Sequence, residues 1–221
     1  MSFNFWHMTD RKIMPIQNGV GFIHVDFQAR VTGAGHNIPQ FFSEHSPAKL
    51  SKIISRATNR AGERFQTVMV KETAETYYTR PKDIRASLDG IKRSKGNDYT
   101  FLMISKGKRH SLRDYKITPE RPQKGGNTLI YGAVKRDGGL KPLQRKDDKS
   151  PTGFLVRLGN GKYYPFYRIG EGKHKIKGYM SPSIPQLMKN SRNVELAVRE
   201  AQKTFEKRLD HELLKQWGLN P

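Results

Sequence analysis

The sequence contains no cysteine. Disulfide bonds are therefore excluded, as are metal and redox sites built on thiolates, and the absence fits a reducing compartment. No apolar run approaches the roughly 20 residues that cross a bilayer. Residues 1–10 also lack the basic segment followed by an apolar one that marks a usual secretion signal. We therefore expect a soluble chain with no membrane partner.

Acidic residues are scarce beside basic ones. The chain has 20 Asp and Glu against 41 Lys and Arg, a net charge of +21, and its isoelectric point is near 10.2. Hydrophobic residues make up only 35% of its 221 residues. That supply suits one core, or one domain with an appendage, and does not suit two full domains. The charge indicates a polyanion, usually nucleic acid, or acidic protein partners.

Residues 1–46 differ from the rest of the chain. They hold three basic and three acidic residues, so the whole net charge lies in residues 47–221. They also hold seven of the thirteen Phe and Trp residues, and residues 20–31 alternate as a strand does. This arm either buries its aromatic side chains partly against another subunit or folds onto its own core. The candidate interface residues are Phe3, Phe5, Trp6, Phe41 and Phe42.

Residues 46–78 have the pattern of one long amphipathic helix. Ser46 is a suitable N-cap, and Pro47 is tolerated at the first helical position. Apolar residues recur at helical spacing, and basic residues lie off that stripe. The stripe comprises Leu50, Ile53, Ile54, Ala57, Ala61, Phe65, Val68 and Met69. A helix of about 45–50 Å indicates an elongated subunit or an assembly; the alternative is an ordinary core helix with a solvated basic face.

The remaining pattern predicts an α+β fold. We expect strands at 99–105 and 128–134, a short helix at 82–88 and a final helix at 193–217. Asn160-Gly161 predicts a two-residue hairpin turn within 153–170, with Val156 opposite Pro165 and the apolar face covering the long helix. Residues 182–185 are expected to be irregular. In this fold the two long helices pack on a small, mostly antiparallel sheet, and the N-terminal arm is extended.

A basic segment follows the long helix. Residues 80–124 contain 13 basic and 5 acidic residues, with a basic turn at 106–110. Lys106, Lys108, Arg109 and Arg113 are the candidate contact loop for a partner protein or for DNA. A charged loop that contacts only solvent is the alternative.

No pattern in the sequence predicts an enzyme. The seven histidines show no metal-binding spacing, and Gly33-Ala34-Gly35 and Gly170-Glu171-Gly172-Lys173 each lack a residue that a nucleotide-binding loop requires. Asp114 and Glu120 are poorly spaced for a nuclease. We therefore expect no catalytic residues, no cofactor and no metal.

The order of several short motifs resembles the minor tail protein Z family of tailed bacteriophages and prophages. The motifs are Asn59-Arg60 in the long helix, Arg109-His110-Ser111-Leu112 leading to Thr118-Pro119, Gly153-Phe154, Pro182-Ser183-Ile184-Pro185, and the closing helix. The resemblance covers residues 47–221, so that residues 47–221 form a domain like those of tail-completion proteins and residues 1–46 lie outside it.

The resemblance implies a structural virion protein of the tail and neck, assembled in the cytoplasm of a bacterial host. Such a protein completes the head-proximal end of the tail tube and mediates head-tail joining, often as a homo-oligomer that forms a six-fold ring. Its partners would be the tail terminator or tail tube protein and the head-tail connector, and DNA in the channel is a possible contact. The alternative function is a basic nucleic-acid-binding module without enzymatic activity, supported by the charge.

Overall fold

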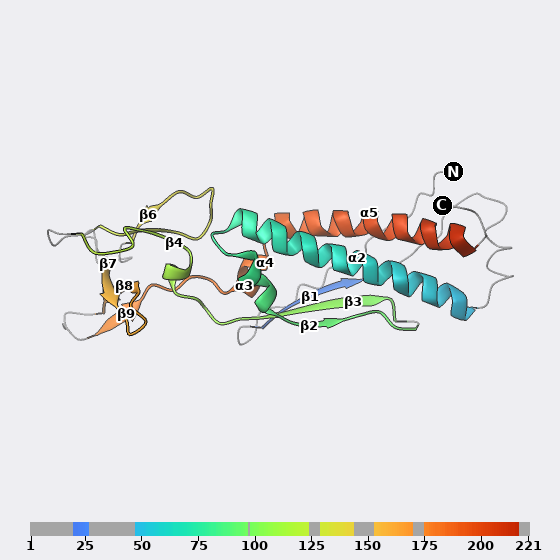
Figure 1. Ribbon diagram of the computed structural model, residues 1–221, viewed down its shortest axis with the longest axis horizontal. Helices are drawn as coiled ribbons and strands as arrows, with labels where there is room; N and C mark the ends of the chain where they lie inside the picture. Colours follow the sequence, from blue (N-terminus) through green and yellow to red (C-terminus); the bar gives the residue numbers. More distant parts are fainter. Residues whose placement is uncertain are drawn as a thin grey trace.

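The computed structural model describes residues 20–26, 47–96, 98–123, 129–143, 153–169 and 175–216. It shows an elongated α+β molecule (Figure 1). One end is the helical part, with helices α2 (Pro47–Thr76), α3 (Pro81–Ala86), α4 (Ile184–Met188) and α5 (Ser191–Gln216) around strands β1 (Val20–Asp26), β2 (Leu88–Lys92) and β3 (Thr100–Lys106). The other end is the β part. It contains η1 (Leu112–Asp114), β4 (Lys116–Thr118), β5 (Tyr131–Ala133), β6 (Lys141–Pro142), β7 (Gly153–Arg157), β8 (Tyr163–Arg168) and β9 (Ile176–Gly178).

Helix α2 is the centre of the helical part. Its predicted stripe is confirmed: Ile53, Ala57, Ala61, Phe65, Val68 and Met69 are buried, while Leu50 and Ile54 are half-buried. The basic residues off the stripe are exposed, as their positions on the helix require. They are Lys49, Lys52, Arg56, Arg60, Arg64 and Lys71. The helix ends at Thr76, two residues before the predicted end.

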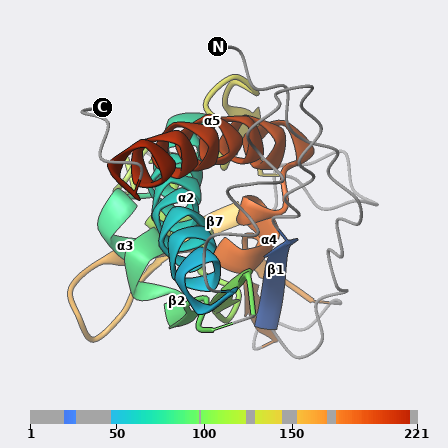
Figure 2. The same ribbon diagram turned by 90° about the vertical axis from the view of Figure 1, so that its right-hand side faces the viewer.

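Helix α5 packs on α2, and Figure 2 shows it lying over one side of that helix. Small residues on both helices are fully buried, including Ala57, Ala61, Ala197 and Ala201. Ion pairs join the two helices at the edge of their contact. Arg64 donates to Glu200 over 2.9 Å, and Arg56 donates to Glu212 over 3.1 Å. The Glu212 side chain is only 6% exposed and also binds Arg208, so its carboxylate is compensated by two cations.

The face of α2 opposite α5 packs on the sheet β1-β3-β2. Phe101 and Met103 of β3 are buried in the common core. Gly62 of α2 makes this contact possible, because a Cβ at that position would overlap the Phe101 ring. Strand β1 pairs antiparallel with β3, with Ile23 opposite Met103. Residues 20–26 of the N-terminal region therefore form an edge strand of this sheet.

A polar stripe on α2 holds the loop between β2 and β3. Asn59 Nδ2 donates to the main-chain oxygen of Ser94 over 3.1 Å, and the Ser94 amide donates back to Asn59 Oδ1 over 2.9 Å. Ser55 Oγ lies 2.9 Å from Ser94 Oγ, and Ser51 Oγ donates to the Gly96 carbonyl. The loop is thus fixed by hydrogen bonds from side chains spaced four residues apart on the helix.

The β part contains two three-stranded antiparallel sheets, β4-β5-β6 and β7-β8-β9. Leu112, Ile117 and Ile130 are buried there, outside the core cluster of the helical part. The prediction of α+β architecture is confirmed, but the described strands form three small sheets instead of one. The hairpin was also expected to cover α2, and it lies instead at the far end from that helix (Figure 1).

Three local predictions were wrong. The hairpin loop has three residues: Gly161 donates to Leu158 O and Leu158 donates to Lys162 O. Gly161, at φ +76°, forms the bulge of this loop type, so Leu155 and not Val156 faces Pro165. Residues 184–188 are helical, because Ser183 and Gln186 form a capping box and proline is compatible with a first turn. The short helix predicted at 82–88 ends earlier, because α3 stops at Ala86 and Leu88 begins β2.

Candidate basic binding site

Four chain segments lie where the helical part meets the β part, and we call this region the waist. They are residues 77–80, 107–111, 134–136 and 180–183. Tyr78 donates to Val134 O over 2.8 Å, and Ser181 donates to His110 O over 2.9 Å. Main-chain hydrogen bonds therefore join the first segment to the third and the second to the fourth.

A cleft of about 800 Å³ opens on one side of the waist. We call it the basic cleft, because cations from several separate segments line it together with two tyrosines. The cations are Arg80, Lys106, Lys108, Arg113, Arg136 and Lys162, and the tyrosines are Tyr78 and Tyr115. Three acidic residues, Asp83, Asp114 and Glu120, also line the cleft, which leaves an excess of positive charge.

Several of these cations are paired with carboxylates. Arg80 Nε lies 2.7 Å from an Asp83 oxygen, and the hydrogen bond to Asp83 raises the pKa of Arg80. Lys106 pairs with Asp89, and Arg113 pairs with Glu120 at 3.3 Å. These side chains are held in position by their partners, although exposed pairs add little stability.

Other cations in the cleft have no carboxylate partner among the described residues. Lys108 and Lys162 are exposed and form no ion pair with any residue that the structure describes. Arg136 binds main-chain oxygens of Ala74 and Tyr77, and its guanidinium lies 4.8 Å from the centre of the Tyr78 ring. The full charge of these three residues is therefore available to an anionic partner.

Tyr115 forms part of the cleft wall. Its hydroxyl donates to Pro182 O over 3.2 Å. Burial raises the pKa of Tyr115, since the ionised phenolate would lose solvation. The side chain therefore stays neutral under ordinary conditions and presents its ring and hydroxyl as an uncharged wall beside the cations.

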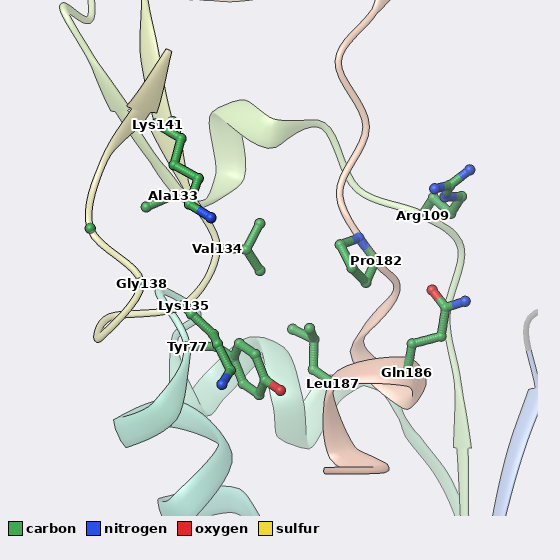
Figure 3. Close-up of a pocket in the computed structure, with 12 residues that line it drawn as sticks. Tyr77, Arg109, Ala133, Val134, Lys135, Gly138, Lys141, Pro182, Gln186 and Leu187 are labelled. Atoms are coloured by element: carbon green, nitrogen blue, oxygen red, sulfur yellow. The ribbon is translucent and has the colours of Figure 1, made fainter. Parts of the chain in front are cut away.

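A second hollow of about 600 Å³ also lies at the waist, lined by Arg109 of the segment 107–111. Its floor is more apolar, with Tyr77, Val134, Pro182 and Leu187. Figure 3 shows basic side chains at both of its ends, with the apolar residues between them. The basic residues are Arg109, Lys135 and Lys141.

The four predicted contact residues thus line two different hollows. Lys106, Lys108 and Arg113 share the basic cleft, while Arg109 lines the second hollow. The predicted interface residues of the N-terminal arm, Phe3, Phe5, Trp6, Phe41 and Phe42, lie outside the described residues. Sequence reasoning missed Arg80, Arg136, Lys162 and the two tyrosines. They come from separate segments, and only the Tyr-Tyr-Thr-Arg run at the end of α2 was a local signal.

The cleft's chemistry is that of anion recognition. Among the described residues, no group of three or more His, Asp or Glu side chains is placed to hold a metal ion. No helix in the described part of the chain is both long and apolar enough to span a bilayer. The cleft presents cations from both parts of the molecule, beside the hydrogen-bonded segments of the waist. This arrangement suits the binding of an acidic macromolecular surface.

Comparison of the chain with known protein families, with curated proteins and with solved structures finds no match in any of the three.

Proposed function

We propose that this chain is a structural protein of a phage tail that completes the head-proximal end of the tail tube and joins the tail to the head. In this proposal its subunits form a closed ring. The ring binds the tail terminator or tube protein on one side and the head-tail connector on the other. The chain performs no catalysis in this role.

The arrangement of the motifs that resemble the minor tail protein Z family supports the proposal. Two of them, residues 109–112 and residues 182–185, flank the same contact at the waist, where Ser181 donates to His110 O over 2.9 Å. Asn59 of a third motif fixes Ser94 through two hydrogen bonds. These contacts support the proposal, because motifs far apart in the sequence lie at positions where chain segments meet.

The basic cleft is the observation that carries the proposal. Cations from the helical part (Arg80, Lys106) and from the β part (Arg113, Lys162) line one opening, with Arg136 between them. A partner surface with matching acidic residues would contact both parts at once and fix their relative position. Electrostatic matching of this kind gives specificity and fast association, as a joining protein needs.

Reversing charge at the waist tests this role. We choose the double variant Lys108→Glu with Arg109→Glu, because neither side chain has an ion pair within the described chain. The matched control is Lys207→Glu with Lys215→Glu, the same charge change at two exposed positions of α5. Each is introduced into the phage that carries this chain, and heads, tails and joined particles are counted by electron microscopy.

The waist variant is expected to accumulate unjoined heads and tails, and the control is expected to join them normally. Normal joining by the waist variant contradicts the assignment of the waist, with its basic cleft and second hollow, as the contact with the partner. A joining defect of equal size in both variants would mean that overall charge, and not this site, is responsible.

A further inference from the structure

The sheet β7-β8-β9 has an inner and an outer face. Strand alternation and the observed register place Gly153, Pro165 and Tyr167 on one face. That face turns inward: Pro165 is fully buried, and a Cβ at Gly153 would meet Leu143. The Tyr167 ring lies 4.9 Å from the ring of Tyr179, whose hydroxyl donates to Leu143 O.

The opposite, outer face is aromatic. It carries Phe154, Tyr164 and Phe166, which lie on adjacent strands and are only half-buried. Ile176, on the same face, is 42% exposed, so the face is open to solvent at β9. No described helix or strand outside this sheet makes a substantial contact with β7 or β9. We call the outer surface formed by Phe154, Tyr164 and Phe166 the aromatic platform.

Positive charge lies beside the platform, and the rest of the sheet is also basic. Arg168 extends its guanidinium over the Phe154 ring, 5.1 Å from the ring centre. Residues 153–169 and 175–178 contain five basic residues and no Asp or Glu. The basic residues, Arg157, Lys162, Arg168, Lys175 and Lys177, are all exposed. An acidic ligand therefore meets no repulsion from this sheet.

We propose that the aromatic platform binds single-stranded nucleic acid. Flat, partly exposed rings on the open face of a sheet allow bases to stack, and nearby cations neutralise the phosphates. A duplex cannot present its base faces to the rings, because they are already stacked. An acidic peptide could form ion pairs with the cations, but its carboxylates offer no aromatic bases to stack on the rings. This inference does not rest on the proposed tail function, because it concerns a different surface.

The test is fluorescence anisotropy with the full chain and a labelled short oligothymidylate, compared with a duplex of equal length. The variant Phe154→Leu with Phe166→Leu keeps apolar side chains on the sheet but removes two stacking surfaces. Its control is Tyr131→Leu, a half-buried aromatic of β5 outside the platform. Circular dichroism confirms that each variant is folded.

We expect the wild-type chain to bind the single strand more tightly than the duplex. The double variant should weaken single-strand binding by about fivefold or more per ring, whereas Tyr131→Leu should leave it unchanged. Arg168→Gln, which removes the cation beside the Phe154 ring, should flatten the salt dependence of binding. Equal affinity of wild type and double variant overturns the proposal. So does equal affinity for duplex and single strand, or complete displacement of the oligonucleotide by polyglutamate of matched charge.

Discussion

The guanidinium Nε of Arg136 donates a hydrogen bond to the main-chain oxygen of Ala74, 3.1 Å away, near the end of α2. A second bond from the same atom reaches Tyr77 O at 3.2 Å, and the Arg136 amide donates to Thr76 O. Carbonyl groups at a helix C-terminus lack intrahelical partners and carry partial negative charge. Arg136 of the β part therefore caps the longest helix of the helical part.

Removing this cap should destabilise the fold. Arg136→Met keeps the apolar stem and removes the charge and both side-chain bonds, so we expect a loss of about 1–2 kcal/mol. Arg136→Lys keeps the charge near the helix end and should lose less. Urea unfolding followed by circular dichroism measures both. Equal stability of wild type and Arg136→Met would show that the cap contributes nothing.

Gly62 should not tolerate a methyl group. Gly62→Ala places a Cβ on the Phe101 ring, and Phe101 is 1% exposed and has little room to move. We expect about 1–3 kcal/mol of destabilisation from overpacking. Gly159→Ala is the matched control, since nothing lies near the added methyl at that position. Thermal unfolding of the two variants gives the measurement. Similar midpoint temperatures for Gly62→Ala and Gly159→Ala would contradict the close packing of α2 on β3.

Asn59 should protect the loop between β2 and β3. Asn59→Ala removes both hydrogen bonds to Ser94. The main-chain amide of Ser94, which is buried, then has no acceptor from Asn59, and we expect a loss of about 1–3 kcal/mol in the free energy of unfolding. Hydrogen exchange at the Ser94 amide should quicken much more than exchange in α5. Thr67→Ala, on the exposed surface of the same helix, is the control. Unchanged protection of Ser94 would count against the polar stripe.

Two acidic residues of α5 should act on stability with opposite sign. The hydrogen bond from Arg64, with that from Lys203, holds the pKa of Glu200 below its usual value, whereas burial raises the pKa of Asp210. At neutral pH the Glu200 carboxylate is therefore favourable and the Asp210 carboxylate unfavourable. Glu200→Gln should then be less stable than wild type, and Asp210→Asn more stable.

Both differences should vanish in acid. The Glu200 contribution is lost as pH falls through its lowered folded-state pKa. The Asp210 penalty is absent below the ordinary aspartate pKa of about 3.9 and grows as pH rises from there toward the raised folded-state value. Urea midpoints of the three proteins across this range provide the measurement. A difference that persists unchanged at low pH would mean that the substitution acts through packing and not through charge.

The sequence predicted what depends on local periodicity. The apolar stripe of α2 was correct because apolar residues at helical spacing define one face regardless of what packs there. The hairpin was found, but its register was wrong by one residue, since Gly159 before Asn160-Gly161 permits a three-residue loop. Its position in the molecule depends on long-range packing, which the local pattern does not encode.

The site was predicted only in part for the same reason. Lys106, Lys108 and Arg113 lie in one basic segment and were found from composition. Arg136 belongs to the waist and Lys162 follows the hairpin loop. Both line the cleft although they lie far from the basic segment along the chain, so composition did not reveal them. The aromatic platform was missed because its rings alternate with inward-facing residues, and only the strand register separates the two sets.

The mass of the purified, nuclease-treated protein, measured by light scattering at moderate and high salt, tests the central claim most directly. The proposed ring subunit should form one discrete closed oligomer that persists in high salt, because salt screens charges but does not weaken apolar contacts. A monomer at both salt concentrations that becomes large only when nucleic acid is added back would contradict a self-assembling tail protein.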